Sequence, residues 1–241
     1  MVPKIKIVAI ITARSGSKSI LYKNVRELGG IPLLGWGVKA LMKSKLIDNV
    51  ILSTDSEQYF LKAKSFNEKI IFHKRTQELA EDVPSELVLL DAIREFKDLF
   101  DDESIVVLIQ PTTPFLTGKN VDECVSKLLE YPGVNSCISV RKVSEFPEWM
   151  ITKKNDKEDI CVCSDLSGEF NVRQNLKERW ISNGGIWAVR KKFLEKAHKI
   201  VDNEAVLIYE MPKMKSIDID EEDDFILCEA LVKSGYLQPD K

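Results

Sequence analysis

Residues 6–20 read KIVAIITARSGSKSI, and this stretch decides the fold. Its first seven residues, 6–12, form a run rich in isoleucine and valine, which is typical of a strand buried on both faces of a parallel sheet. A basic loop of small residues follows the run at once. Because ligands bind beyond the carboxyl ends of strands in open parallel sheets, the sequence predicts a ligand-binding loop at this edge.

Similar runs recur along the chain and alternate with helix-like segments. The predicted strands cover residues 6–12, 49–54, 69–73, 104–109, 136–140, 185–189 and 205–209. The predicted helices, with apolar residues at helical spacing, cover residues 33–44, 56–67, 85–97, 118–131 and 221–234. This alternation predicts an α/β domain with a sheet covered on both faces.

The alternation stops between residues 141 and 182. This stretch is polar, contains Pro147 and a charge run at 153–159, and includes short alternating pieces. It predicts an inserted subdomain rich in β-hairpins within one domain that spans residues 1–241.

Composition narrows the function classes. The chain has 241 residues, 44% of them hydrophobic and 30% charged, with a net charge of -3, so no overall basic excess attracts a nucleic acid. No apolar run approaches the roughly 18 residues of a membrane span. We expect a cytoplasmic protein without membrane or nucleic-acid partners. The five cysteines, at 124, 137, 161, 163 and 228, form no zinc-binding set and are expected to be reduced.

The loop at residues 13–20 is suited to phosphate. Ser15, Gly16 and Ser17 are small enough for backbone N–H groups to approach phosphate oxygens, and Arg14 and Lys18 add positive charge. The loop matches neither the Walker A pattern nor the G-x-G-x-x-G dinucleotide pattern. Taken alone, it could also be a solvated basic turn.

Two further segments carry polar groups. Gln110-Pro111-Thr112-Thr113-Pro114 follows a buried strand and is either a ligand-binding or a structural turn. Asp218 and Asp220 alternate in an extended segment, so both carboxylates would share one face and could hold Mg²⁺. The acids at 221–224 are explained by the opening of the last helix, whereas Asp218 is not.

A fourth segment runs from Arg173-Gln174 through Trp180 to Asn183-Gly184-Gly185. The last three residues also predict a tight bend before a strand. Arg173 and Arg141 are candidates for bidentate pairing with a substrate carboxylate, and the sequence leaves Arg179 and Arg190 open for the same role.

Together these segments closely resemble the CMP-sialic acid synthetases, the cytidylyltransferases that activate nonulosonic acids. The resemblance extends over nearly the whole chain. It also includes LGGIPL at 28–33, STDS at 53–56, LAED at 79–82 and SIDIDEEDDF at 216–225.

The resemblance implies a Rossmann-like nucleotidyltransferase fold with a mostly parallel sheet, and a Mg²⁺-dependent transfer of CMP from CTP to the acid. It implies a homodimer, with the insert of one subunit packing at the sugar site of the other. The implied catalytic residues are Arg14, Lys23, Asp218 and Asp220, of which the two aspartates would bind the metal. The implied nucleotide-binding residues are Ala13, Arg14, Ser15, Gly16, Ser17, Lys18, Asn24, Arg75, Ser85 and Gln110. The implied substrate-binding residues are Gln110, Arg141, Arg173, Gln174, Trp180 and Asn183.

The sequence departs from the family on the sugar side. Lys177 and Glu178 replace prolines, and Trp180 and Trp187 stand where tyrosines are usual. These changes do not affect the motifs expected to bind the nucleotide, but they leave open which acid is the substrate. Alternatives are another sugar nucleotidyltransferase, of the CMP-Kdo or sugar-phosphate type, or an inactive nucleotide-binding relative. A dehydrogenase is disfavoured because G-x-G-x-x-G is absent.

Overall fold

The computed structural model describes residues 4–17, 19–153, 161–163 and 172–239. The chain divides into two compact units. The larger consists of Met1–Val140 and Ser182–Lys241, and the smaller of Arg141–Ile181.

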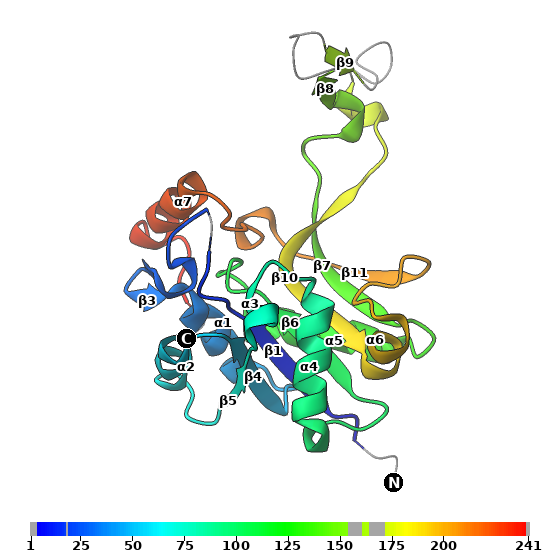
Figure 1. Cartoon of the computed structure of the whole chain (residues 1–241). Coiled ribbons are helices and arrows are strands. Elements are labelled where there is room, and N and C mark those ends of the chain that lie inside the picture. The colour runs from blue at the N-terminus through cyan, green and yellow to red at the C-terminus, as the bar shows by residue number, and fades with distance from the viewer. Residues whose placement is uncertain (1–3, 18, 154–160, 164–171, 240–241) are drawn as a thin grey trace. The chain divides into compact units, whose positions relative to one another are not determined.

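A seven-stranded sheet, in the order β11-β7-β10-β6-β1-β4-β5, forms the centre of the larger unit (Figure 1). Its strands are β1 (Ile7–Thr12), β4 (Asn49–Thr54), β5 (Ile71–Lys74), β6 (Ile105–Ile109), β7 (Ser136–Lys142), β10 (Trp180–Arg190) and β11 (Val206–Glu210). The pairs β1–β4, β1–β6, β4–β5 and β7–β11 are parallel, whereas β10 runs antiparallel to β6. The predicted mostly parallel sheet is confirmed.

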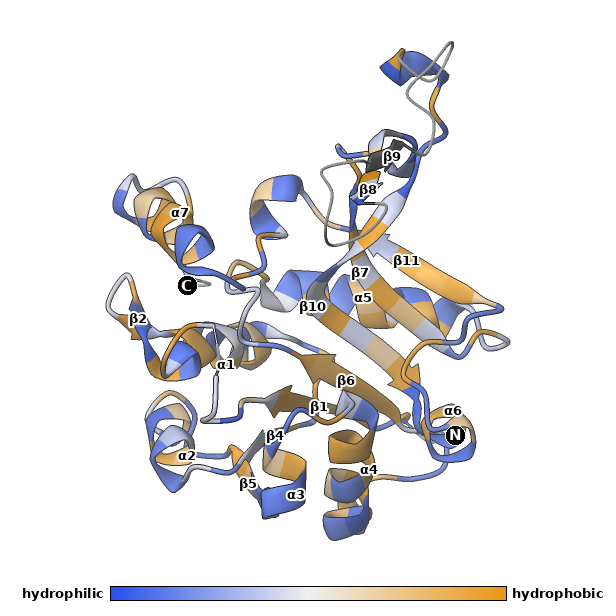
Figure 2. Cartoon of the chain, turned by 45° about the horizontal axis from the view of Figure 1, so that its top comes forward, coloured by the Kyte–Doolittle hydropathy of each residue, from blue (hydrophilic) through white to orange (hydrophobic). Residues whose placement is uncertain are grey.

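The central strands are buried on both faces, as their continuous apolar runs predict. In β1, Ile7, Ala9 and Ile11 point into one core cluster, while Val8 and Ile10 point into another on the opposite face. Figure 2 shows β1 and β6 coloured as hydrophobic along their length. Two cores, one on each face, therefore fix the register of the sheet.

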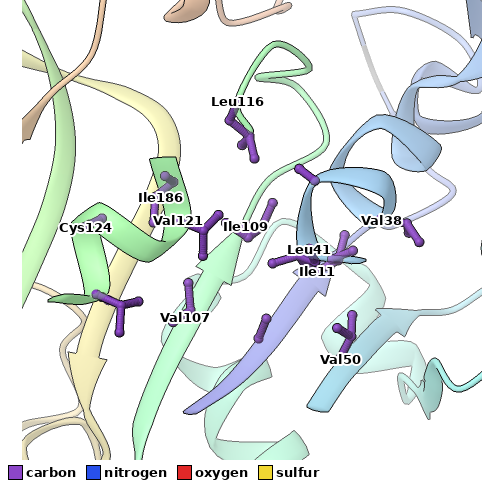
Figure 3. Close-up of a cluster of buried hydrophobic side chains, with 14 of the residues drawn as sticks. Ile11, Val38, Leu41, Val50, Val107, Ile109, Leu116, Val121, Cys124 and Ile186 are labelled. Atoms are coloured by element: carbon purple, nitrogen blue, oxygen red, sulfur yellow. The ribbon is translucent and has the colours of Figure 1, made fainter. Parts of the chain in front are cut away.

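Helices cover both faces. They are α1 (Leu33–Lys43), α2 (Glu57–Lys64), α3 (Gln77–Ala80), α4 (Ser85–Glu95), α5 (Gly118–Glu130), α6 (Lys191–Ala197) and α7 (Glu222–Lys233). Helices α1, α2 and α5 pack on the face that holds Ile11, and Figure 3 shows Val38 and Leu41 of α1 and Val121 of α5 there. Helices α4 and α6 pack on the other face.

A third core cluster anchors the C-terminal helix near the carboxyl edge of the sheet. Phe225 of α7 and Ile219 before it are fully buried together with Trp36 of α1, whose indole N–H donates to the Leu28 carbonyl at 3.1 Å. Leu28 belongs to the short pair β2 (Glu27–Leu28) and β3 (Ile31–Pro32). This cluster holds residues 218–220 at a fixed place.

The bend predicted at Asn183-Gly184-Gly185 is wrong. These residues lie inside β10, which is longer than expected, and Gly184 has a positive φ of 70°. The short helix α3 was not predicted, because four residues carry too little periodicity.

The smaller unit contains β8 (Ile151–Lys153) and β9 (Cys161–Cys163), paired antiparallel, and the 3₁₀ turns Pro147–Trp149 and Arg173–Asn175. Elsewhere, Cys124, Cys137 and Cys228 are free thiols. No helix within the described ranges is long and apolar enough to cross a membrane.

Candidate functional site

One polar pocket of about 400 Å³ opens at the carboxyl edge of the sheet. It lies there because β1 ends at Thr12, β5 ends just before Arg75, and β6 ends just before Gln110. Its lining residues are Thr12, Arg14, Ser17, Ser19, Lys23, Asn24, Arg75, Glu81, Asp82, Val83, Ser85, Val88, Gln110, Pro111, Thr112, Asp218 and Asp220. Residues from five separate stretches of the chain thus meet in one site.

The loop after β1 is held by side chains from outside it. Both the backbone N–H (2.7 Å) and the hydroxyl of Ser15 donate to the Asp55 carboxylate. On the other side, the Asn24 amide donates to the Arg14 carbonyl at 2.9 Å. Ala13 is buried and Gly16 exposed. Asp55 lies in the STDS segment, to which sequence reasoning gave no role. Lys18 lies outside the described residues.

Two of the pocket's cations, Arg14 and Lys23, face carboxylates in this structure. Arg14 forms an ion pair with Asp82, which also lines the pocket. The Lys23 ammonium donates to the Ile219 carbonyl at 2.7 Å and lies 3.6 Å from Asp220. An anionic ligand entering the pocket would compete with these carboxylates for both cations.

Arg75 is a buried cation at the base of the pocket. Its Nε–H donates to the Ser53 hydroxyl at 2.9 Å, and its Nη1 to the Leu79 carbonyl at 3.3 Å. Burial lowers the pKa of its guanidinium to about 10, which leaves it charged at neutral pH. Ser85, at the start of α4, lines the same pocket.

Asp218 is the least satisfied polar side chain of the site. Among the described residues, its Oδ1 is buried and has no hydrogen-bond partner. Burial, and secondarily the charge of Asp220, raises the pKa of Asp218, although a hydrogen bond from Thr112 opposes this. Residues 216–220 do not form a strand, but both aspartates line the pocket as expected.

The Gln110–Pro114 turn and β10 together set the position of Asp218. The Ile219 N–H donates to the Thr112 carbonyl at 2.8 Å. A Cβ built on Gly184 would lie 2.4 Å from Asp218 Oδ2, so only glycine allows this approach. The signal in the sequence was the Asn-Gly-Gly pattern, which indicated an unusual backbone conformation but not that Asp218 lies beside Gly184.

Asn183 does not line this pocket. Its side-chain oxygen accepts from Ser139 Oγ at 2.6 Å and its nitrogen donates to Ser216 Oγ at 2.9 Å, and the residue is 3% exposed. These bonds hold β10 against the segment that leads to Asp218.

The other candidates for sugar binding lie in the smaller unit. Arg141 and Trp180 line one apolar hollow there, and Arg173 and Gln174 line a second. Of the arginines left open by the sequence, Arg179 pairs with Glu148. Arg190 donates to the carbonyls of residues 128, 131 and 134, which places it at the end of α5.

A family model described as cytidylyltransferase matches residues 8–217. The chain belongs to the cytidylyltransferase family. The match includes the loop after β1 and the Gln110–Pro114 turn, and it stops immediately before the two aspartates.

Curated relatives of this cytidylyltransferase carry more specific names. It is 32% identical to N-acylneuraminate cytidylyltransferase A of Danio rerio, over 97% of this chain and 52% of that protein. It is 32% identical to the N-acylneuraminate cytidylyltransferase of Escherichia coli O18:K1:H7, over 92% of this chain and 51% of that protein. It is 28% identical to the CMP-N,N'-diacetyllegionaminic acid synthase of Legionella pneumophila, over 95% of this chain and 97% of that protein. The chain thus spans about half the length of the first two and nearly all of the third.

Solved structures support the fold. CMP:2-keto-3-deoxy-manno-octonic acid synthetase complexed with CTP superposes with a TM-score of 0.69 at 14% identity, over 95% of this chain and 99% of that one. A 4-diphosphocytidyl-2C-methyl-D-erythritol synthase superposes with a TM-score of 0.67 at 13% identity, over 95% of this chain and 99% of that one. The Rossmann-like nucleotidyltransferase fold is therefore confirmed.

Proposed function

We propose that this cytidylyltransferase joins CMP from CTP to the anomeric hydroxyl of a nonulosonic acid. The observation that carries this proposal is the pocket itself, where Arg14, Lys23 and Arg75 converge with Asp218 and Asp220. Cations suit a triphosphate and a pair of carboxylates suits a divalent metal, so this pocket suits CTP together with a metal ion. The names of the N-acylneuraminate and legionaminic acid relatives support the acceptor class.

The donor set fits Mg²⁺. The described residues contain no group of three or more clustered metal-ligating side chains, but Mg²⁺ is commonly held by one or two carboxylates together with water and substrate phosphates. Asp218 offers a buried oxygen without a partner, and Asp220 a second, exposed carboxylate. When bound there, Mg²⁺ would offset the negative charge of the phosphate oxygens.

The chain's own residues would position the nucleotide and stabilise the leaving group. The sugar oxygen forms a bond to the α-phosphorus of CTP, the bond from that phosphorus to the oxygen that bridges to the β-phosphate breaks, and the hydroxyl proton passes to water. Arg14 and Lys23 would stabilise the charge that develops on pyrophosphate. Arg75, Asn24 and Ser85 would contact the cytidine, and Gln110 would lie between nucleotide and sugar.

The sugar side of the proposal rests on the family resemblance. The acid's carboxylate would pair either with Arg173, which shares a hollow with Gln174, or with Arg141, which shares a hollow with Trp180. A homodimer in which the smaller unit of one subunit serves the other's site remains a prediction. Asn183 would act indirectly, because its amide is already fully bonded within the fold. CTP supply suits a cytoplasmic location.

The test is pyrophosphate release from CTP across a panel of nonulosonic acids, with Kdo as a comparison acid and EDTA as a control. Release with one nonulosonic acid, abolished by EDTA, is the expected result. Release only with Kdo would favour the CMP-Kdo type. Tight CTP binding without pyrophosphate release in the presence of any acid would contradict the proposed activity and favour an inactive nucleotide-binding relative.

A further inference from the structure

Behind the pocket, a buried hydrogen-bonded row leads from Arg75 to the surface of α4. Ser53 of β4 and His73 of β5 are register partners, and both side chains are fully buried. The Ser53 hydroxyl lies 2.9 Å from Arg75 Nε and 2.8 Å from His73 Nδ1. The other ring nitrogen, Nε2, lies 3.1 Å from the Asp91 carboxylate and 3.5 Å from the Glu95 carboxylate, both of α4.

The donor and acceptor properties of these groups determine which group donates in each hydrogen bond of the row. The Arg75 Nε–H can only donate, so the Ser53 oxygen accepts from it. The Asp91 carboxylate can only accept, so the hydrogen of a neutral His73 ring sits on Nε2. Nδ1 is then an acceptor, and the Ser53 hydroxyl donates its own hydrogen to it. Every group in the row is satisfied in one arrangement.

The opposite arrangement leaves a group unsatisfied. With the hydrogen on Nδ1, the Ser53 oxygen could accept from both Arg75 and His73, but the Ser53 hydroxyl hydrogen would then need another acceptor, and Nε2 would carry no hydrogen to donate to the Asp91 carboxylate. Among the described residues, this hydroxyl bonds only to Arg75 and His73. A buried hydroxyl without a partner is costly, so the fold selects the first arrangement.

We propose that Ser53 and His73 are positioning residues, which orient the Arg75 guanidinium toward the nucleotide in the pocket. Arg75 needs such support, since within the described part of the chain no carboxylate forms an ion pair with it. Its backbone N–H is also fixed, by the Thr54 carbonyl at 3.1 Å. With Nε and Nη1 held by the protein, the remaining N–H groups are free to serve the pocket that Arg75 lines.

The first test reads the row directly and needs no substrate. The chain has only two histidines, so a long-range ¹H–¹⁵N spectrum of the full chain, with His198→Gln to assign the signals, reports the His73 tautomer. We expect the neutral ring with hydrogen on Nε2, and a slowly exchanging Arg75 Nε–H that is lost in Ser53→Ala. A ring with hydrogen on Nδ1, or a doubly protonated ring at neutral pH, would overturn the proposal.

The second test measures CTP affinity by calorimetry and rests on the proposed function. We expect Ser53→Ala to weaken CTP binding about 10-fold, the loss of one hydrogen bond to a charged group. In an Arg75→Lys background, which lacks the Nε–H, Ser53→Ala should have no further effect. Equal weakening by Ser53→Ala in both backgrounds would show a merely structural role.

Ser104→Ala is the matched control. Ser104 is also fully buried and hydrogen-bonded, to Asp101, but at the opposite edge of the sheet, so CTP affinity should not change. If Ser53→Ala does not fold, Asp91→Ala changes the row at its partly exposed end instead. We expect Asp91→Ala to weaken CTP binding by less than the roughly 10-fold loss expected for Ser53→Ala. If the unmodified chain binds no CTP, the proposed function fails, while the tautomer measurement still decides the hydrogen-bonded row.

Discussion

Gly184→Ala tests whether β10 places Asp218. Gly184 has a φ of 70°, where a side chain costs about 1–2 kcal/mol. Its Cβ would also lie 2.4 Å from Asp218 Oδ2, about 1 Å short of ordinary contact. Because β10 lies between β7 and β6 in the sheet, we expect the carboxylate to move and the strand to stay in place.

The expected result is a loss of both stability and activity. We expect the free energy of unfolding to fall by about 1–3 kcal/mol, which lowers the Tm by about 2–12 °C for a chain of this size. A displacement of about 1 Å in a catalytic group can reduce turnover by about 100-fold. Thermal unfolding and Mg²⁺-dependent pyrophosphate release from CTP measure the two effects.

Gly30→Ala separates the two causes. Gly30 has a similar φ of 76°, but a Cβ there would meet no atom within 4 Å. This control should lose about as much stability from the backbone and keep its activity. If Gly184→Ala is no less active than Gly30→Ala, Asp218 is not held by this contact and the reasoning is wrong.

Three other substitutions probe the site and its frame. Asp218→Asn should reduce turnover by at least about 100-fold and abolish the rise in Tm that Mg²⁺ gives the unmodified chain. Since burial raises the pKa of Asp218, the folded state binds its proton more tightly than the unfolded state. As pH falls through this raised pKa, the free energy of unfolding of the wild type should therefore rise relative to that of Asp218→Asn. Urea unfolding of both proteins over a pH series measures the difference, and a difference that falls with falling pH would show that the sign is wrong. Asp55→Asn removes the charge that holds two donors of Ser15 and should weaken CTP affinity about 10-fold with little change in Tm, whereas unchanged affinity in calorimetry would exclude a role for Asp55 in shaping the loop. Arg190→Met leaves the carbonyls at the end of α5 without their donor and should lower the free energy of unfolding by about 1–3 kcal/mol at full activity, which denaturant unfolding and the release assay check together.

Much of the site could be predicted because its parts follow buried strands. The loop at residues 13–20 and the Gln110–Pro114 turn each come directly after an apolar run, and parallel strands bring their carboxyl ends to one edge. Asp218 and Asp220 were predicted to bind metal from residue type, and both line the pocket. The supports were not predictable, because Asp55, Ser53 and His73 touch the site only across strand pairs.

The sequence by itself determined the layers of this protein. Continuous runs such as residues 6–12 can be buried only between two helix layers, and their order along the chain makes most of the sheet parallel. Only the tertiary structure decided which polar groups act on one another. The antiparallel β10 brings Gly184 against Asp218, and the register of β4 with β5 brings Ser53 against His73 and Arg75. Hydrogen bonds and close contacts depend on ångström-scale positions that long-range packing sets, whereas local hydrophobic periodicity fixes only which face of an element is buried.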